Sequence, residues 1–345
     1  MTIVETRAVT GGVDTHHSVH VAAALDEIGG LLGVESFPTT VAGYHALLSW
    51  LAGFGEIQVI GIEGTGSYGA GLARHAARRR IRVVEVDRAD RAARRRAGKS
   101  DPLDAIAAAR AALSGKASGA SKGRDGHVEA IRALALAKRS ARADRVRAIN
   151  QMRALIVTAP DDIRARFTSA SATVLVADTA ALRPRPGDTV AHATRSSLRE
   201  LGRRAAYLAA EIDRIESILK PLLVERAPAL LALPGVGPDV AAILLIAAGD
   251  NPERLRSEAS WAHLCGVAPI PASSGKITRW RLNPAGDRQA NHALWRIVFS
   301  RMSFDPRTQA YVNRRLAEGR TKPEIIRILK RYVAREVYPH LRDDR

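Results

Sequence analysis

The sequence has little cysteine, few aromatic side chains and no long apolar run. Its single cysteine, Cys265, excludes an internal disulfide, as is typical of proteins of a reducing cytoplasm. No apolar stretch reaches the length of about 18 residues that would predict a membrane span, and the N-terminus lacks the layout of a secretory signal. Phe, Trp and Tyr make up 4% of the chain, which disfavours an aromatic platform as the main way of binding nucleic-acid bases.

Acidic residues are scarce relative to basic ones. The 345 residues include 53 Lys and Arg against 35 Asp and Glu, a net charge of +18, with arginine clusters at 78–80 and 94–96. Clustered positive charge indicates a polyanionic partner, most simply nucleic acid. The chain is 46% hydrophobic, and its length predicts roughly two or three domains with cores of their own.

Residues 1–126 have the alternating pattern of an α/β domain. Apolar and polar residues alternate over 13–25, which predicts a strand with one buried face and one polar face that carries Asp14. Three histidines, His16, His17 and His20, match no standard zinc-ligand spacing and are predicted to be residues of that polar face.

A second acidic residue, Glu63, follows the apolar strand predicted over 57–62 and precedes a Gly-Thr-Gly turn. The carboxyl end of a strand is where α/β folds place ligands, although a structural turn with an incidental glutamate explains the same pattern. The turn lacks the lysine of a phosphate-binding P-loop, so that type of site is excluded.

A third pair of acids, Asp101 and Asp104, lies where a helix rich in alanine should begin. Asp101 is predicted as the N-cap and Pro102 as the first helical residue. Spacing of three places both carboxylates on one helix face, where they suit a divalent cation. Helix capping near the positive end of the helix dipole explains the same residues, so both interpretations stay open.

The remainder of the chain is predicted to be mostly helical. Apolar residues repeat in steps of three and four from Leu198 to Leu222, a heptad pattern that predicts a coiled-coil seam whose partner is either the helix at 127–157 or a second copy. The segment Leu233–Val240 resembles a helix-hairpin-helix DNA-binding motif. We predict an α/β domain at 1–126, a helical coiled-coil region at 127–226 and a mostly α C-terminal domain at 227–345.

Taken together, Asp14, Glu63, Asp101 and Asp104 support the hypothesis of one metal site. Four acids on strands, strand ends and helix starts of one α/β domain could hold two divalent ions for phosphodiester chemistry. Their order is similar to that of ribonuclease-H-like nucleases. The motifs around them also resemble, in order and spacing, the Asp-Glu-Asp-Asp motif of insertion-sequence family 110 transposases; these motifs are Val13-Asp14-Thr15, Ile62-Glu63-Gly64-Thr65-Gly66-Ser67-Tyr68 and Lys99-Ser100-Asp101-Pro102-Leu103-Asp104-Ala105.

The resemblance extends to the C-terminal domain, where the family has a serine before a glycine, as in Ser274-Gly275. It implies a recombinase in which Ser274 attacks a DNA phosphodiester while the four acids bind Mg²⁺ or Mn²⁺, guided by a structured non-coding RNA. It implies a homo-oligomer, a dimer or tetramer, at the nucleoid in a bacterial cytoplasm. The basic residues expected to contact nucleic acid are Lys99, Lys276, Arg279, Arg281 and Arg288.

The sequence departs from the family pattern at three places. Gly64 stands where alanine usually follows the glutamate, residues 283–286 read Asn-Pro-Ala-Gly where the family often has Ser-Lys-x-Gly, and Ser273 is a second candidate nucleophile beside Ser274. Two other functions remain open: a ribonuclease-H-like junction resolvase or nuclease that uses water, which needs the acids alone, and an architectural DNA-binding protein, which needs neither the acids nor the serine.

Overall fold

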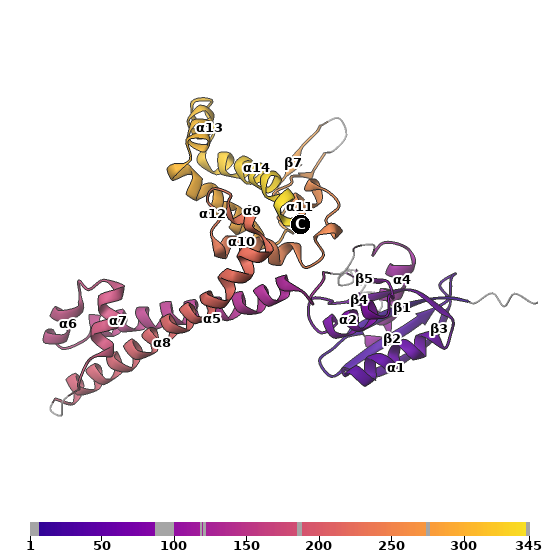
Figure 1. The fold of residues 1–345 in the computed structure, drawn as a ribbon, viewed down its shortest axis with the longest axis horizontal. Helices are drawn as coiled ribbons and strands as arrows, with labels where there is room; N and C mark the ends of the chain where they lie inside the picture. Colours follow the sequence, from indigo (N-terminus) through magenta and orange to yellow (C-terminus); the bar gives the residue numbers. More distant parts are fainter. Residues whose placement is uncertain are drawn as a thin grey trace, which may run out of the picture. The chain divides into compact units, whose positions relative to one another are not determined.

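The computed structural model describes residues 7–86, 100–117, 119, 122–184, 188–273 and 277–342. The chain divides into two compact units, one of residues 1–126 and 248–257 and the other of residues 127–247 and 258–345. The first unit is α/β and the second is almost entirely helical (Figure 1). The boundaries of the three predicted domains are not tested by this division and stay a prediction.

The first unit is built on a five-stranded sheet of order β3-β2-β1-β4-β5. β1, β2 and β3 are antiparallel neighbours, whereas β4 and β5 continue from β1 in parallel. The strands are β1 (Ala8–Thr15), β2 (Val19–Leu25), β3 (Leu31–Pro38), β4 (Glu56–Glu63) and β5 (Val83–Val86), and the helices are α1 (Val41–Ala52), α2 (Ala70–Arg78) and α4 (Asp101–Leu113), with the short 3₁₀ helix η1 (Pro252–Arg254).

The single strand predicted over 13–25 is wrong, because the chain turns back within it. The His16 amide donates a hydrogen bond to the Val19 carbonyl oxygen at 3.2 Å, which closes the β1–β2 hairpin. The predicted polar face is wrong as well, since helices cover both faces of the sheet and nearly all of β1 and β2 is buried. A core that includes Leu47 and Leu51 of α1 packs on one face, and Ala105 of α4 packs on the other.

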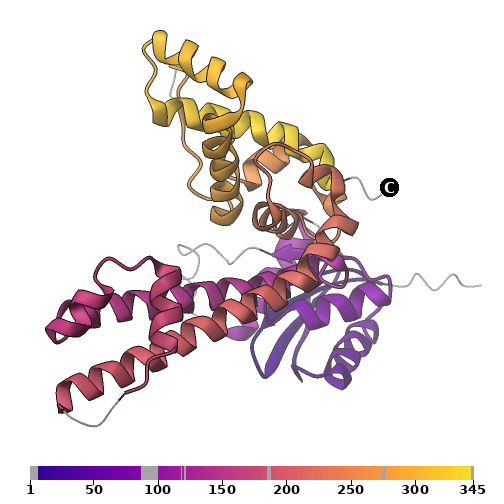
Figure 2. The same ribbon diagram turned by 60° about the vertical axis from the view of Figure 1, so that its left-hand side comes forward.

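The second unit contains a long antiparallel pair of helices, α5 (His127–Val157) and α8 (Thr189–Arg226), which lie side by side in both views (Figures 1 and 2). Two shorter helices, α6 (Asp161–Phe167) and α7 (Ala172–Ala180), share a core with them. Of the predicted seam, Leu198, Ala205, Leu208 and Leu219 are buried. The seam therefore has a partner within the chain, and a coiled coil in the strict sense stays a prediction.

Replacing Leu208 with aspartate is expected to destabilise the second unit by about 3 kcal/mol or more, because a charge would enter an apolar interface. Ile218→Asp is the matched control, since Ile218 lies on the same helix but is 56% exposed; its effect is expected within about 0.5 kcal/mol. Urea unfolding followed by circular dichroism measures both. Equal unfolding midpoints for the two variants would contradict the assigned interface.

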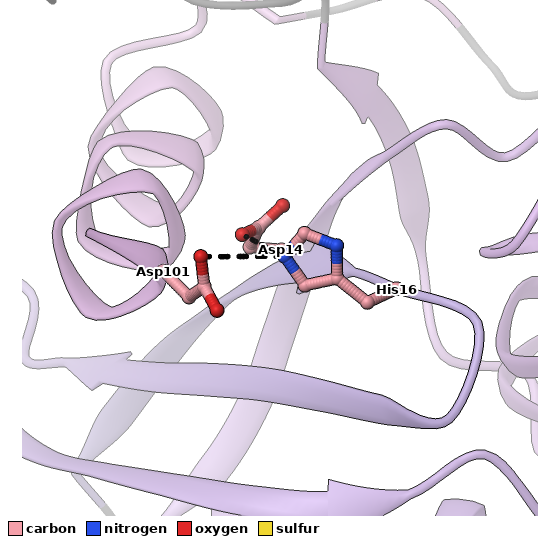
Figure 3. A group of neighbouring side chains, drawn as sticks. All are labelled: Asp14, His16 and Asp101. Carbon is pink, nitrogen blue, oxygen red and sulfur yellow. Dashed lines mark ion pairs between the residues drawn. The ribbon is translucent and has the colours of Figure 1, made fainter. Parts of the chain in front are cut away.

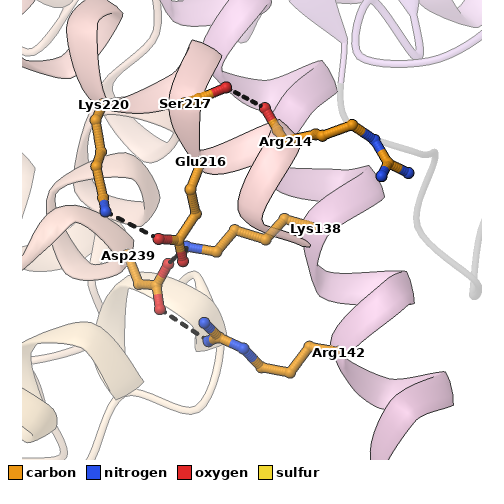
Figure 4. Close-up of polar contacts among 7 residues, drawn as sticks. All are labelled: Lys138, Arg142, Arg214, Glu216, Ser217, Lys220 and Asp239. Carbon is orange, nitrogen blue, oxygen red and sulfur yellow. Dashed lines mark hydrogen bonds and ion pairs between the residues drawn. The ribbon is translucent and has the colours of Figure 1, made fainter. Parts of the chain in front are cut away.

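The C-terminal helices are attached to this pair through an ionic cluster (Figure 4). Lys138 of α5 is buried, and its Nζ lies 2.8 Å from Glu216 Oε1 of α8 and 2.5 Å from Asp239 Oδ1 of α10. Arg142 and Lys220 complete the cluster. Because a buried charge is costly unless it is paired, this arrangement fixes α10 to both long helices.

The described elements of this C-terminal part are helices and one hairpin. They are α9 (Pro228–Leu231), α10 (Pro238–Ala248), α11 (Glu258–Leu264), β6 (Ile270–Pro271), β7 (Trp280–Arg281), α12 (Arg288–Phe304), α13 (Pro306–Ala317) and α14 (Lys322–Arg342). The hairpin predicted over 233–240 joins α9 to α10. Among the described helices, none has the length and apolarity needed to cross a bilayer.

Candidate active site

Asp14 lies near the carboxyl end of β1, the central strand of the sheet, and is 6% exposed. Burial raises the pKa of its carboxyl group, the nearby His16 lowers it, and the negative charges of Asp104 and Asp101 raise it again. The net direction is upward, so the folded protein holds a carboxylate in surroundings that disfavour its negative charge.

The start of α4 reaches Asp14 because α4 lies directly on the strands. Gly12 and Gly61 face the helix backbone: a Cβ on Gly12 would come within 2.1 Å of Ala109 N, and one on Gly61 within 2.6 Å of Ala108 O. Only residues without a side chain allow this approach. The predicted N-cap is wrong by one residue, because Ser100 occupies the N-cap position, without a capping hydrogen bond from its side chain, and Asp101 is the first residue of α4.

Two of the predicted acids meet at one point, together with a histidine (Figure 3). His16 Nε2 lies 3.1 Å from Asp14 Oδ2 and 3.3 Å from Asp101 Oδ1. Ligand atoms of all three side chains lie within 4.8 Å of one another. His16 follows β1 directly and is about half exposed, so sequence reasoning that assigned it to a strand face missed it. Its spacing of two from Asp14 was the available signal.

The other two acids are placed differently. Asp104 lies one turn into α4, close enough for its charge to raise the pKa of Asp14. Glu63 ends β4, and its carbonyl oxygen accepts a hydrogen bond from the Thr15 hydroxyl at 2.8 Å. The backbone of Glu63 is therefore beside the cluster, but its carboxylate is not among the three groups that come together in the described part of the chain.

The departure from the family pattern at Gly64 has a backbone reason. Gly64 has φ = +67°, which lies in the left-handed region where a side chain is strained. A Cβ there would also come within 3.0 Å of Ser67 Oγ. Glycine is the residue that this turn after β4 requires, whereas an alanine would need a different local path.

The donor set fits a divalent cation. Two carboxylates converge on a partly buried point beside one imidazole. Burial raises the pKa of Asp14, and the negative charges of Asp104 and Asp101 raise it further. A cation would relieve that repulsion. Carboxylate oxygens suit Mg²⁺ and Mn²⁺, and an imidazole nitrogen suits Mn²⁺ and other transition metals, so the residues present do not choose between the ions.

The predicted serine and two of the basic residues lie outside the described residues; these are Ser274, Lys276 and Lys99. Next to them, Ser273 Oγ accepts a hydrogen bond from the Arg279 amide at 3.2 Å, across the β6–β7 hairpin. This contact gives Ser273 a part in holding the hairpin. Arg279, Arg281 and Arg288 are exposed, as side chains that contact nucleic acid must be.

Two family models match the chain. One, described as a transposase model for the Asp-Glu-Asp-Asp transposases of the IS110 type, covers residues 11–159 and so contains all four acids. The second, described as "Transposase IS116/IS110/IS902 family", covers residues 227–313. The chain belongs to the IS110 family of transposases. The predicted family is thereby confirmed over both the acidic domain and the C-terminal domain.

Two curated proteins of insertion elements align with the chain over shorter segments. The IS110 uncharacterized 43.6 kDa protein of Streptomyces coelicolor is 31% identical over 157 residues, which are 45% of this chain and 37% of that protein. The IS900 uncharacterized 42 kDa protein of Mycobacterium paratuberculosis is 28% identical over 118 residues, 34% of this chain and 30% of that protein. The matches thus span about a third of each relative's length.

Proposed function

We propose that the chain is a DNA recombinase that cuts and rejoins DNA for an insertion sequence. The observation that carries the proposal is the meeting of Asp14 and Asp101, from β1 and α4, in a chain of the IS110 transposase family. The order β3-β2-β1-β4-β5, with three antiparallel strands followed by two parallel ones, supports a ribonuclease-H-like fold for the first unit.

In this proposal the acids position a divalent ion for phosphodiester cleavage. Asp14 and Asp101 would bind it directly, with Asp104 and Glu63 completing the set and His16 orienting the two carboxylates. A bound Mg²⁺ or Mn²⁺ supplies positive charge to stabilise a developing oxyanion. Because β1 and α4 are in direct backbone contact, their carboxylates are held in place before substrate arrives.

Ser274 is proposed as the nucleophile: its Oγ would bond to the phosphorus while the bond from phosphorus to the 3′ oxygen breaks, which would leave a 5′-phosphoserine link and a free 3′ hydroxyl. A serine hydroxyl is weak until a base takes its proton or a metal ion lowers its pKa, so the serine would depend on the acidic site. Lys276, Arg279, Arg281 and Arg288 would stabilise negative charge at the phosphorus centre, and Lys99 would contact the backbone near the acids. The family membership disfavours a purely architectural role and a water-using nuclease.

The proposal further includes a structured RNA guide and assembly into a dimer or tetramer. A recombination assay tests the guide: donor and target plasmids are combined with the protein, with and without the transcribed flank of the element, and junctions are sequenced. Sedimentation of the protein tests the assembly. Junctions that form only with the flank support RNA guidance. Junctions of equal yield without it would remove the guide from the proposal and leave the recombinase.

Binding to nucleic acid is expected to weaken steeply with salt, because Lys and Arg release counterions from phosphates. With about six phosphate contacts, tripling the salt from 50 to 150 mM lowers affinity by roughly two to three orders of magnitude. Fluorescence anisotropy with a duplex of fixed sequence measures the slope. A nearly flat dependence would contradict the role assigned to the net charge of +18.

A further inference from the structure

Three aromatic side chains form a row on one face of α12, in contrast to their scarcity in the chain as a whole. The rings of His292 and Trp295 have centroids 5.5 Å apart and planes 23° apart, and those of Trp295 and Phe299 are 5.0 Å and 20° apart. The three rings, which we term the α12 stack, are all exposed, Phe299 by 59%. Contiguous exposed apolar side chains, unlike single ones, are typical of interaction sites.

The α12 stack is open at the Phe299 end. The next residue on that face, four positions along, is Ser303, whose small side chain cannot cover a ring. Phe299 and Ser303 both line a hollow of about 1060 Å³, whose other side is the hairpin Gly235–Asp239 and Lys220. A flat ring entering this hollow would extend the stack by one layer.

The hairpin beside the α12 stack is held in place by α12 itself. Arg301 Nε donates to the Pro234 carbonyl oxygen at 2.7 Å, and the same guanidinium pairs with Glu336 of α14. Gly237 has no heavy atom within 4 Å of the position a Cβ would take, so the hairpin presents open backbone. Glycine backbone of this kind allows a phosphate to approach closely.

Cationic side chains line the hollows beside the α12 stack. A second hollow of about 480 Å³ adjoins the first, because Lys138, Asp239 and Arg296 line both, and His292 lines it. Among the described residues, neither Arg139 nor Arg296 makes an ion pair. Six cationic side chains and three carboxylates line the two hollows together. The cationic residues are Arg132, Lys138, Arg139, Arg142, Lys220 and Arg296, and the acidic residues are Glu216, Asp239 and Asp287.

We propose that the α12 stack and its two hollows bind a single-stranded segment of nucleic acid, with an unpaired base stacked on Phe299 and its flanking phosphates near Lys220 and Arg296. Rings favour unpaired bases, because a base inside a duplex has both faces covered by its neighbours. The surplus of positive charge favours a polyanion over an apolar protein segment. This inference rests on the proposed function, because the site would hold part of the recombinase's nucleic acid. The binding itself depends on neither the acids nor Ser274.

The test compares single strands of equal length that have or lack bases. Fluorescein-labelled 12-nucleotide oligothymidine and oligouridine are titrated against the full chain in EDTA, beside a 12-nucleotide abasic strand with the same phosphates. Phe299→Ala is expected to weaken binding of the base-containing strands about five- to a hundredfold and to leave the abasic strand unchanged. Phe299→Trp, which keeps a ring face, is expected to restore binding.

Phe304→Ala is the matched control, because Phe304 is exposed on the same helix and lines neither hollow. The thymine and uracil arms identify whether DNA or RNA is preferred. Wild-type affinity in Phe299→Ala, or an equal loss for the abasic strand, would overturn the proposal. So would a change in oligomeric state of Phe299→Ala by sedimentation, since the α12 stack would then be a protein interface. Binding that persists in Asp101→Asn separates this site from the proposed recombination.

Discussion

Asp101→Asn is expected to abolish DNA strand cleavage while the fold and the affinity for DNA are retained. The amide has the shape of the carboxylate but removes one negative charge and one strong metal donor from the point where Asp14, His16 and Asp101 meet. Metal stabilisation of a developing charge is worth several kcal/mol, so the rate is expected to fall by about 10³-fold or more.

The measurement is cleavage of a labelled donor duplex, with Mn²⁺ binding by titration calorimetry as an independent readout. Glu56→Gln is the matched control, since Glu56 is an exposed carboxylate at the opposite end of β4 from Glu63. Circular dichroism checks that both variants are folded. Cleavage by Asp101→Asn at the wild-type rate would remove the acidic site from the mechanism, whatever the metal titration showed.

Ser274→Ala is expected to eliminate recombination and the covalent protein–DNA adduct together, with DNA binding retained. The hydroxyl is the proposed nucleophile, and alanine removes it without adding bulk. Reactions stopped in denaturant and resolved by gel electrophoresis detect the adduct, and peptide mapping locates it. The acids alone cannot supply a serine–phosphate link, so this variant separates the recombinase from a water-using nuclease.

Ser273→Ala serves as the control for its neighbour. The Ser273 hydroxyl accepts a hydrogen bond from the Arg279 amide, so its loss is expected to loosen the hairpin and lower the rate moderately without removing the adduct. An active Ser274→Ala beside an inactive Ser273→Ala would move the nucleophile by one residue. If both serine variants stay active and DNA cleavage still needs Asp101, the result would favour the water-using nuclease.

The structure brings together two of the four carboxylates that the sequence predicted to form a metal site, and their catalytic role stays a prediction. Residue spacing identified Asp14 and Asp101 because strand ends and helix starts leave a local pattern of glycine, proline and apolar residues. It missed His16, because the alternating pattern assigned residues 13–25 to one strand, whereas the five consecutive polar residues 14–18 include the β1–β2 turn. It also could not orient Glu63, because side-chain direction at a strand end depends on the tertiary packing around it.

In the helical unit, too, the sequence predicted one part of the structure and did not predict another. The repeat from Leu198 to Leu222 predicted a buried seam, and several of its residues are buried, but a heptad does not specify its partner. The packing of α8 on α5 depends on the connection through α6 and α7. The α12 stack was missed because a low aromatic content describes an average, and three rings on one helix face hardly change it.

The separation of Asp14 and Asp101 along the chain has a consequence for when the protein can act. β1 is synthesised early, but the start of α4 leaves the ribosome only after β5, and α4 must then dock on Gly12 and Gly61. Until that docking, a nascent chain carries Asp14 and Glu63 on the sheet without the carboxylate of Asp101. In the proposed mechanism, cleavage therefore cannot begin before α4 has docked, and a chain truncated before α4 would carry the first two acidic motifs without the carboxylate of Asp101 beside Asp14.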